Sequence, residues 1–227
     1  MEEPAVDIVY SRTARRFIGR WKSGRVRLTA PAGASEAEIR RALDSLMPRL
    51  LARRPAASLY ADGQKIEQPG ICVVIRVSPD ARGRVAVRGT TASAELLVDP
   101  SLSLADADVQ RAVSGLLLRM ARSRSREVLL PAAVLKAREL GLAPASWATG
   151  SGVRTLGTCS ARGEITLSAA LMFMPPELRT YVICHELAHL THHNHSAAFH
   201  ALLDSYLDGR ERELKAKLRA FPLPLVR

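Results

Sequence analysis

The histidines of this chain are confined to one short stretch. All six lie between His185 and His200, and the 184 residues before them contain none. The stretch opens with HELAH, which is the H-E-x-x-H pattern. Residues four apart lie on one face of a helix, so both imidazoles reach a single cation when this segment is helical. The pattern therefore predicts a metal-binding helix.

The residue types within the pattern favour catalytic zinc. Zinc accepts imidazole nitrogens and lowers the pKa of a bound water towards neutrality. Glu186 follows His185 directly, so its carboxylate lies beside the metal and can take a proton from the metal-bound water. We therefore predict His185 and His189 as Zn²⁺ ligands and Glu186 as the general base. A solvent-exposed, histidine-rich helix end is the alternative that the pattern leaves open.

The flanking residues fit such a helix. Pro176 is tolerated in the first helical turn, and the negative charge of Glu177 is favoured there. We expect the helix to run from about Pro176 to His193. Asn194 can adopt the left-handed conformation that ends a helix, and Ser196 can cap the next one.

A catalytic zinc site usually takes three protein ligands, and four histidines follow the motif. His192 shares the helical face of His185, but it lies about 10 Å further along the axis, which is too far for one ion on a straight helix. His195 follows the expected break at Asn194, so the chain can turn back and present it. We predict His195 as the third ligand, with His200 in reserve.

The first hundred residues are predicted to be rich in strands. Apolar residues alternate or run together in three stretches that are typical of strands: Val6–Tyr10, Val26–Ala30 and Ile71–Val77. One helix is expected after Ser35 and Glu38, which have capping-box spacing, and Pro48 should end or kink it. We expect a basic, β-rich region with one helix over residues 1–100 and a metallohydrolase domain over residues 101–227.

The charge of the chain suggests an acidic partner. There are 33 Lys and Arg residues against 22 Asp and Glu, a net charge of +11. Such a chain is attracted to phosphate-rich partners, so nucleic acid is one candidate partner. The alternative is that the arginines fill solvated positions, since no recognition motif accompanies them. The 4% share of aromatic residues argues against a base-stacking single-strand binder.

Other features indicate the compartment. No apolar run approaches the ~20 residues that span a bilayer, and the first residues lack the apolar core of a secretory signal. Three scattered cysteines are too few for a disulfide framework. We expect a cytoplasmic protein with no membrane partner.

Residues 185–203, HELAHLTHHNHSAAFHALL, resemble the YgjP-like metal-dependent hydrolases and, more distantly, the SprT-like and Wss1-like proteases. In that pattern a histidine follows the motif after five residues, then a small residue and a phenylalanine, which match His195, Ser196 and Phe199. Upstream, residues 154–159 (RTLGTC) are similar to the family's Arg-x-Trp-Gly-Ser-Cys motif. Leu156 replaces its tryptophan and Thr158 its serine.

The resemblance covers about residues 138–208 and implies an α+β, zincin-like fold. In that fold a small mixed sheet packs on the active-site helix, with an edge strand near the metal. We expect residues 164–168 to form this strand, so that Glu164, Ile165 and Thr166 align an extended peptide by strand addition. Arg154 could stabilise an oxyanion or bind a substrate carboxylate. It could equally be a structural ion-pair partner.

The sequence therefore predicts a zinc metallopeptidase that acts on a peptide or protein substrate. Two alternatives remain open at this point. One is a zinc hydrolase of nucleotides or other anionic small molecules. The other is a DNA- or RNA-associated, protease-like module.

Overall fold

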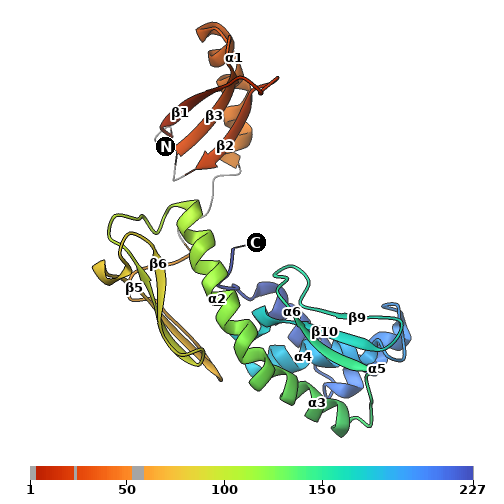
Figure 1. The fold of residues 1–227 in the computed structure, drawn as a ribbon. Coiled ribbons are helices and arrows are strands. Elements are labelled where there is room, and N and C mark those ends of the chain that lie inside the picture. Colours follow the sequence, from red (N-terminus) through yellow and green to blue (C-terminus); the bar gives the residue numbers. More distant parts are fainter. Residues whose placement is uncertain (1–3, 23–24, 53–58, 227) are drawn as a thin grey trace.

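The structure, a computed structural model, describes residues 4–22, 25–52 and 59–226 (Figure 1). Its elements in chain order are β1 (Val6–Ser11), β2 (Ile18–Lys22), β3 (Arg25–Pro31), α1 (Glu36–Ala52), β4 (Lys65–Gln68), β5 (Ile71–Val77), η1 (Pro79–Ala81), β6 (Val85–Gly89), β7 (Ser93–Val98), α2 (Ala107–Glu127), α3 (Leu129–Glu139), β8 (Ser146–Gly150), β9 (Gly157–Cys159), β10 (Glu164–Ser168), η2 (Ala169–Phe173), α4 (Pro176–Ala188), α5 (Ala197–Tyr206) and α6 (Glu211–Ala220). The six helices and three small mixed sheets of these described residues make the α+β class that the sequence predicts, and they are consistent with a zincin-like domain.

The first sheet and α1 form a small unit with its own core. Its strand order is β1-β3-β2, with β3 parallel to β1 and antiparallel to β2. Leu28 and Ala30 of β3 are fully buried and cluster with Ile39 of α1. The predicted capping box is present, because the Ser35 N–H donates to Oε2 of Glu38 at 2.9 Å.

The prediction that Pro48 ends or kinks this helix is wrong as to the end, since α1 continues to Ala52. Proline removes one hydrogen bond to the carbonyl four residues earlier, which belongs to Asp44. Both Asp44 and Pro48 are exposed, so water can satisfy that carbonyl.

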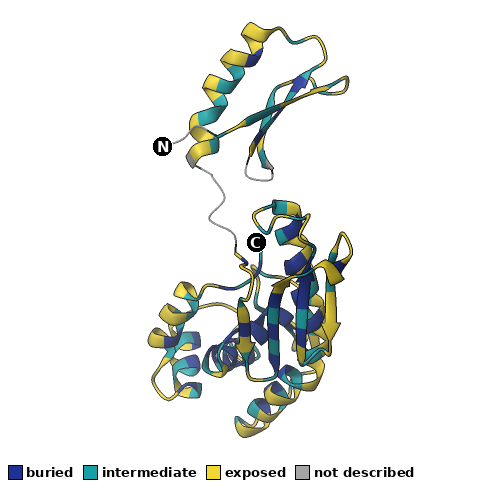
Figure 2. Ribbon diagram, turned by 90° about the vertical axis from the view of Figure 1, so that its left-hand side faces the viewer, coloured by how far each residue is buried: buried dark blue, intermediate teal, exposed yellow. Residues whose placement is uncertain are grey.

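The larger unit is built around α2. A four-stranded sheet with the order β4-β5-β7-β6 lies on one side of α2, and the region of α4, α5, β9 and β10 lies on the other (Figure 1). One hydrophobic cluster extends from Tyr60 to Leu225, and dark buried residues fill this unit in Figure 2. The cores therefore divide between Ala52 and Tyr60, not at the predicted boundary of residue 100. The segment that holds β4–β7 is rich in strands, as expected, but these strands share their core with α4.

Two arginines attach the four-stranded sheet to the helices beside the site. Arg179 of α4 is buried, and its guanidinium donates to the carbonyls of Met174, Met172 and Pro69 at 2.8–2.9 Å. Arg124 of α2 donates to the neighbouring carbonyl of Gly70 at 2.8 Å. The bond from Arg179 to Pro69 holds α4 against the β4–β5 turn, and the bond from Arg124 to Gly70 holds α2 against it. In the described residues, no helix has the length and apolar character needed to cross a membrane.

Candidate metal and catalytic centre

The helix that carries the motif begins at Pro176, as predicted, but it is shorter than predicted. α4 ends at Ala188, not at His193. Asn194 is not left-handed, because Arg82 and Asp208 are the non-glycine residues with positive φ in the described part of the chain. The prediction of Asn194 as the helix end is therefore wrong.

Hydrogen bonds close to the end of α4 explain the early stop. The N–H of Leu190 donates to the carbonyl of Leu187 three residues earlier, a tighter turn than the α-helix. The carbonyl of His192 then turns towards His189 and lies 2.9 Å from its Nδ1. This turn brings the chain back so that His195 reaches the site.

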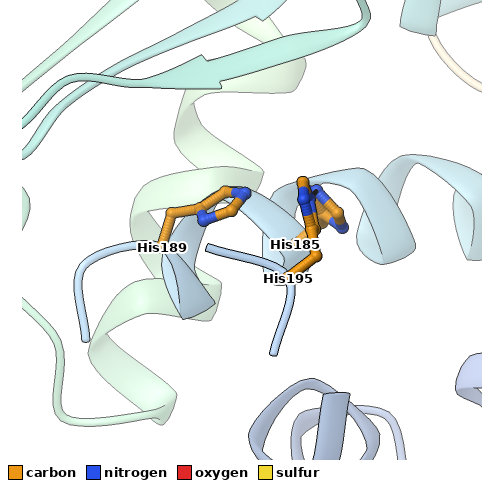
Figure 3. A group of neighbouring side chains, drawn as sticks. All are labelled: His185, His189 and His195. Atoms are coloured by element: carbon orange, nitrogen blue, oxygen red, sulfur yellow. Dashed lines mark hydrogen bonds between the residues drawn. The ribbon is translucent and has the colours of Figure 1, made fainter. Parts of the chain in front are cut away.

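Three histidines converge at the end of α4 (Figure 3). The ligand atoms of His185, His189 and His195 all lie within 4.8 Å of one another, and the Nε2 atoms of His185 and His195 are 3.1 Å apart. Tetrahedral zinc with ~2.0 Å bonds to nitrogen needs such atoms about 3.4 Å apart. The donor set and its spacing therefore fit a zinc ion.

The hydrogen bonding of His189 prepares it as a ligand. Its Nδ1 donates to the main-chain carbonyl of His192, which leaves the lone pair of Nε2 free. Metal-binding histidines commonly use this arrangement to fix the ring and its tautomer. His192 is thus outside the ligand group, as its axial distance predicts, but its carbonyl orients a ligand.

The pKa values of two of the three imidazoles are lowered, which favours the neutral form that binds metal. Burial, followed by the neighbouring charges of His189 and His195, lowers the pKa of His185 to about 4. Burial also lowers the pKa of His195 below its ordinary value. His200, the reserve candidate, lies outside the triad, with its Nδ1 3.1 Å from Oε1 of Glu211.

Phe199 forms the floor of the site, a role that the sequence did not reveal. Its ring centroid lies 5.0, 4.6 and 4.9 Å from those of His185, His189 and His195. Phe199 is fully buried in α5, a helix that Ser196 caps as predicted. The signal available beforehand was its place in the family pattern. A rigid apolar surface beneath three ligands restricts their rotation.

Glu186 lies beside the triad on the buried side of α4. The residue is 5% exposed, and burial raises the pKa of its carboxyl to about 7. Its carboxylate packs on β9 at Gly157, where an added Cβ would lie 2.5 Å from Oε1. Gly157 belongs to the RTLGTC stretch, and the sequence pattern predicts no role for it. A glycine inside a strand is the available signal of such a close approach.

The prediction that residues 164–168 form an edge strand is wrong. β10 is the central strand of the sheet β8-β10-β9, parallel to β8 and antiparallel to β9. Ile165 is fully buried, and Glu164 accepts a hydrogen bond from the Ser160 hydroxyl at 3.1 Å. Thr166 faces Thr158 of β9. The strand that contacts Glu186 is β9, through Gly157. The strand β8, whose sequence is SWATG, lies on the other side of β10.

Arg154 lies exposed in the loop between β8 and β9. None of the ion pairs found among the described residues includes Arg154, so the predicted structural ion pair is not observed there. A contact between Arg154 and substrate stays a prediction.

One of the three comparisons with known proteins finds a match. A family model described as the YgjP-like metallopeptidase domain matches residues 15–221. No curated protein and no solved structure matches the chain. The family match covers most of the chain, including α4, the turn that carries His195, and β9. The chain therefore belongs to the YgjP-like metallopeptidase family.

Proposed function

We propose that this protein is a zinc-dependent metallopeptidase. His185, His189 and His195 would hold the zinc ion, and Glu186 would be the general base. The observation that carries the proposal is the convergence of three imidazoles beside one buried carboxylate.

Zinc, when bound, supplies a Lewis acid and lowers the pKa of a water molecule in its remaining position. Glu186 would take the proton of the attacking water and pass it to the leaving nitrogen of the peptide. The carboxylate suits both steps by its position, because it is buried directly beside the three imidazoles.

The free edge of β9 is the place where an extended peptide would bind. The Leu156 carbonyl points towards β10, where it accepts the Ser168 N–H at 2.8 Å, and Thr158 two residues on points the same way, opposite Thr166. Alternation along a strand then directs the groups of Gly157 and Cys159 outwards. A substrate strand paired there would run beside Glu186. Glu164, Ile165 and Thr166 would support β9 from behind, and exposed Arg154 would bind a carboxylate of the substrate.

The test combines metal analysis with a substrate panel. We expect one equivalent of zinc in the purified protein and hydrolysis of members of a peptide library. Glu186→Gln should keep the zinc and lose the hydrolysis. Protein without stoichiometric metal would refute the proposal. Hydrolysis of nucleotides but not peptides would favour the zinc hydrolase of anionic small molecules.

The small N-terminal unit favours a second property, association with DNA or RNA. Arg20 of β2 lies directly opposite Arg27 of β3, and like charges opposite each other destabilise a sheet. The carboxylate of Asp7, which lies opposite Arg27 across β1 and β3, forms its ion pair with Arg25, at 2.8 Å. Nε of Arg27 is buried, with no hydrogen-bond partner among the described residues. A phosphate backbone would neutralise these charges, and the peptidase would then act on nucleic-acid-bound proteins.

Fluorescence polarisation with labelled duplex DNA and RNA at two salt concentrations tests this association. Binding should weaken steeply at the higher concentration, and Arg20→Gln should reduce it at both. Absent binding, or binding that salt does not change, would refute it.

A further inference from the structure

The contact between β9 and Glu186 involves the whole length of the glutamate side chain. An added Cβ at Gly157 would lie 2.5 Å from Oε1, 2.7 Å from Cγ and 2.8 Å from Cδ of Glu186. Non-bonded carbons pack at about 3.5–4.0 Å, so each of these separations is a clash. Rotating the carboxylate alone cannot relieve it, because Cγ is an inner atom of the chain. Only the absence of a side chain at position 157 leaves room for Glu186.

Backbone conformation does not require glycine at this position. Gly157 is not among the described glycines with positive φ, so its conformation is open to other residues. No atom other than those of Glu186 is among the three nearest to the added Cβ. Glycine is therefore required here because Glu186 occupies the space that a side chain at position 157 would fill.

Neither Gly157 nor Glu186 can move away from the other without breaking other contacts. Gly157 pairs with Leu167 in the antiparallel ladder, and the adjacent Leu156 carbonyl accepts the Ser168 N–H at 2.8 Å. Glu186 belongs to α4, whose buried face packs in the main core. A displacement of about 1 Å at a catalytic group can cost about 100-fold in rate. The position of β9 therefore decides where the carboxylate lies relative to the histidines.

We propose that Gly157 is a positioning residue for Glu186. Its missing side chain forms the slot that holds the carboxylate beside the metal ligands. The main-chain groups of Gly157 face the free edge of β9, so the residue that seats the base also borders the predicted peptide path. This inference rests on the proposed function, because it assigns to Glu186 the role of general base.

The first experiment compares Gly157→Ala with Gly150→Ala. Gly150 lies in β8 of the same sheet, and its added Cβ would meet a Thr166 methyl group at 3.3 Å. We expect Gly157→Ala to retain one equivalent of zinc and to lower kcat by about 100-fold with little change in KM. Gly150→Ala should keep kcat within a few-fold of the wild type. Wild-type kcat in Gly157→Ala would overturn the inference.

The second experiment needs no enzyme activity. Urea unfolding of the metal-free proteins is measured for the wild type, Gly157→Ala, Glu186→Ala and the double variant. Gly157→Ala should lower the urea midpoint of the wild type, whereas in the Glu186→Ala background it should leave the midpoint unchanged, because the clashing atoms are gone. An equal loss in both backgrounds would show that alanine clashes elsewhere, and would overturn the inference.

The two experiments separate the possible failures. A wild-type protein that binds zinc but hydrolyses no peptide would refute the proposed function, whereas the urea cycle would still decide the Gly157–Glu186 contact. If Gly157→Ala does not fold, the double variant should fold. A double variant that is also unfolded would overturn the inference.

Discussion

Burial of Glu186 should make the stability of the metal-free protein depend on pH in a specific way. The pKa of the buried carboxyl is about 7, against an ordinary value of 4.5. The folded state therefore favours the neutral carboxyl. Stability from this group is fully present below pH 4.5 and is lost as the pH rises through 7. Each tenfold change in proton affinity is worth about 1.4 kcal/mol, so the interval corresponds to about 3 kcal/mol.

Glu186→Gln removes this titration and keeps the shape of the side chain. The difference in unfolding free energy between Glu186→Gln and the wild type should grow by about 3 kcal/mol, in favour of the variant, between about pH 4.5 and pH 7.5. The fixed cost or gain of the amide is the same at every pH, so it does not enter the change. His185, whose pKa is lowered to about 4, titrates in both proteins and cancels.

The assay is urea unfolding at half-unit pH intervals after zinc has been removed with a chelator. Metal removal is essential, because a nearby dication would stabilise the charged carboxylate and hide the effect. A difference that stays within about 0.5 kcal/mol across the range would refute the reasoning. It would mean that Glu186 keeps its solvation in the folded protein.

Two further substitutions test the predicted ligand His195 and the packing of Phe199 beneath the three histidines. His195→Ala should weaken zinc binding at least about tenfold in a chelator competition, whereas exposed His193, replaced by alanine, should not. Unchanged affinity in His195→Ala would remove it from the ligand set. Phe199→Ala should lower the unfolding free energy by about 3–5 kcal/mol in urea, because it empties a fully buried site. It should also weaken zinc binding, and a loss below about 1 kcal/mol would contradict the packing.

The sequence was sufficient for the centre of the site because its information is local. His185 and His189 share a face of any helix through them, so helix periodicity alone brings them together. The start of α4 at Pro176 followed from proline chemistry in the same way. His195 needed only a chain break after the motif. The break occurs, although hydrogen bonds near Ala188 produce it earlier than the expected residue Asn194.

Only the tertiary structure decided which distant segments pack against α4. The pattern of β10 shows a strand, but strand alternation does not say that β8 takes one side and β9 the other. Local patterns also do not say which segments share a core. The strands β4–β7 pack in one core with α4, across the predicted boundary at residue 100. Strand pairing and core packing depend on the relative free energies of alternative arrangements of remote segments. Local periodicity carries no information about these free energies.

Glu186 illustrates what the sequence determines and what the tertiary structure determines. That Glu186 lies beside the metal ligands follows from its position next to His185. That its carboxyl is buried, has a raised pKa and fits against Gly157 depends on β9, which lies about thirty residues earlier in the chain. The sequence thus determines which groups could do the chemistry. The tertiary structure decides their solvation and position, because desolvation and close contact come from neighbours that only folding supplies.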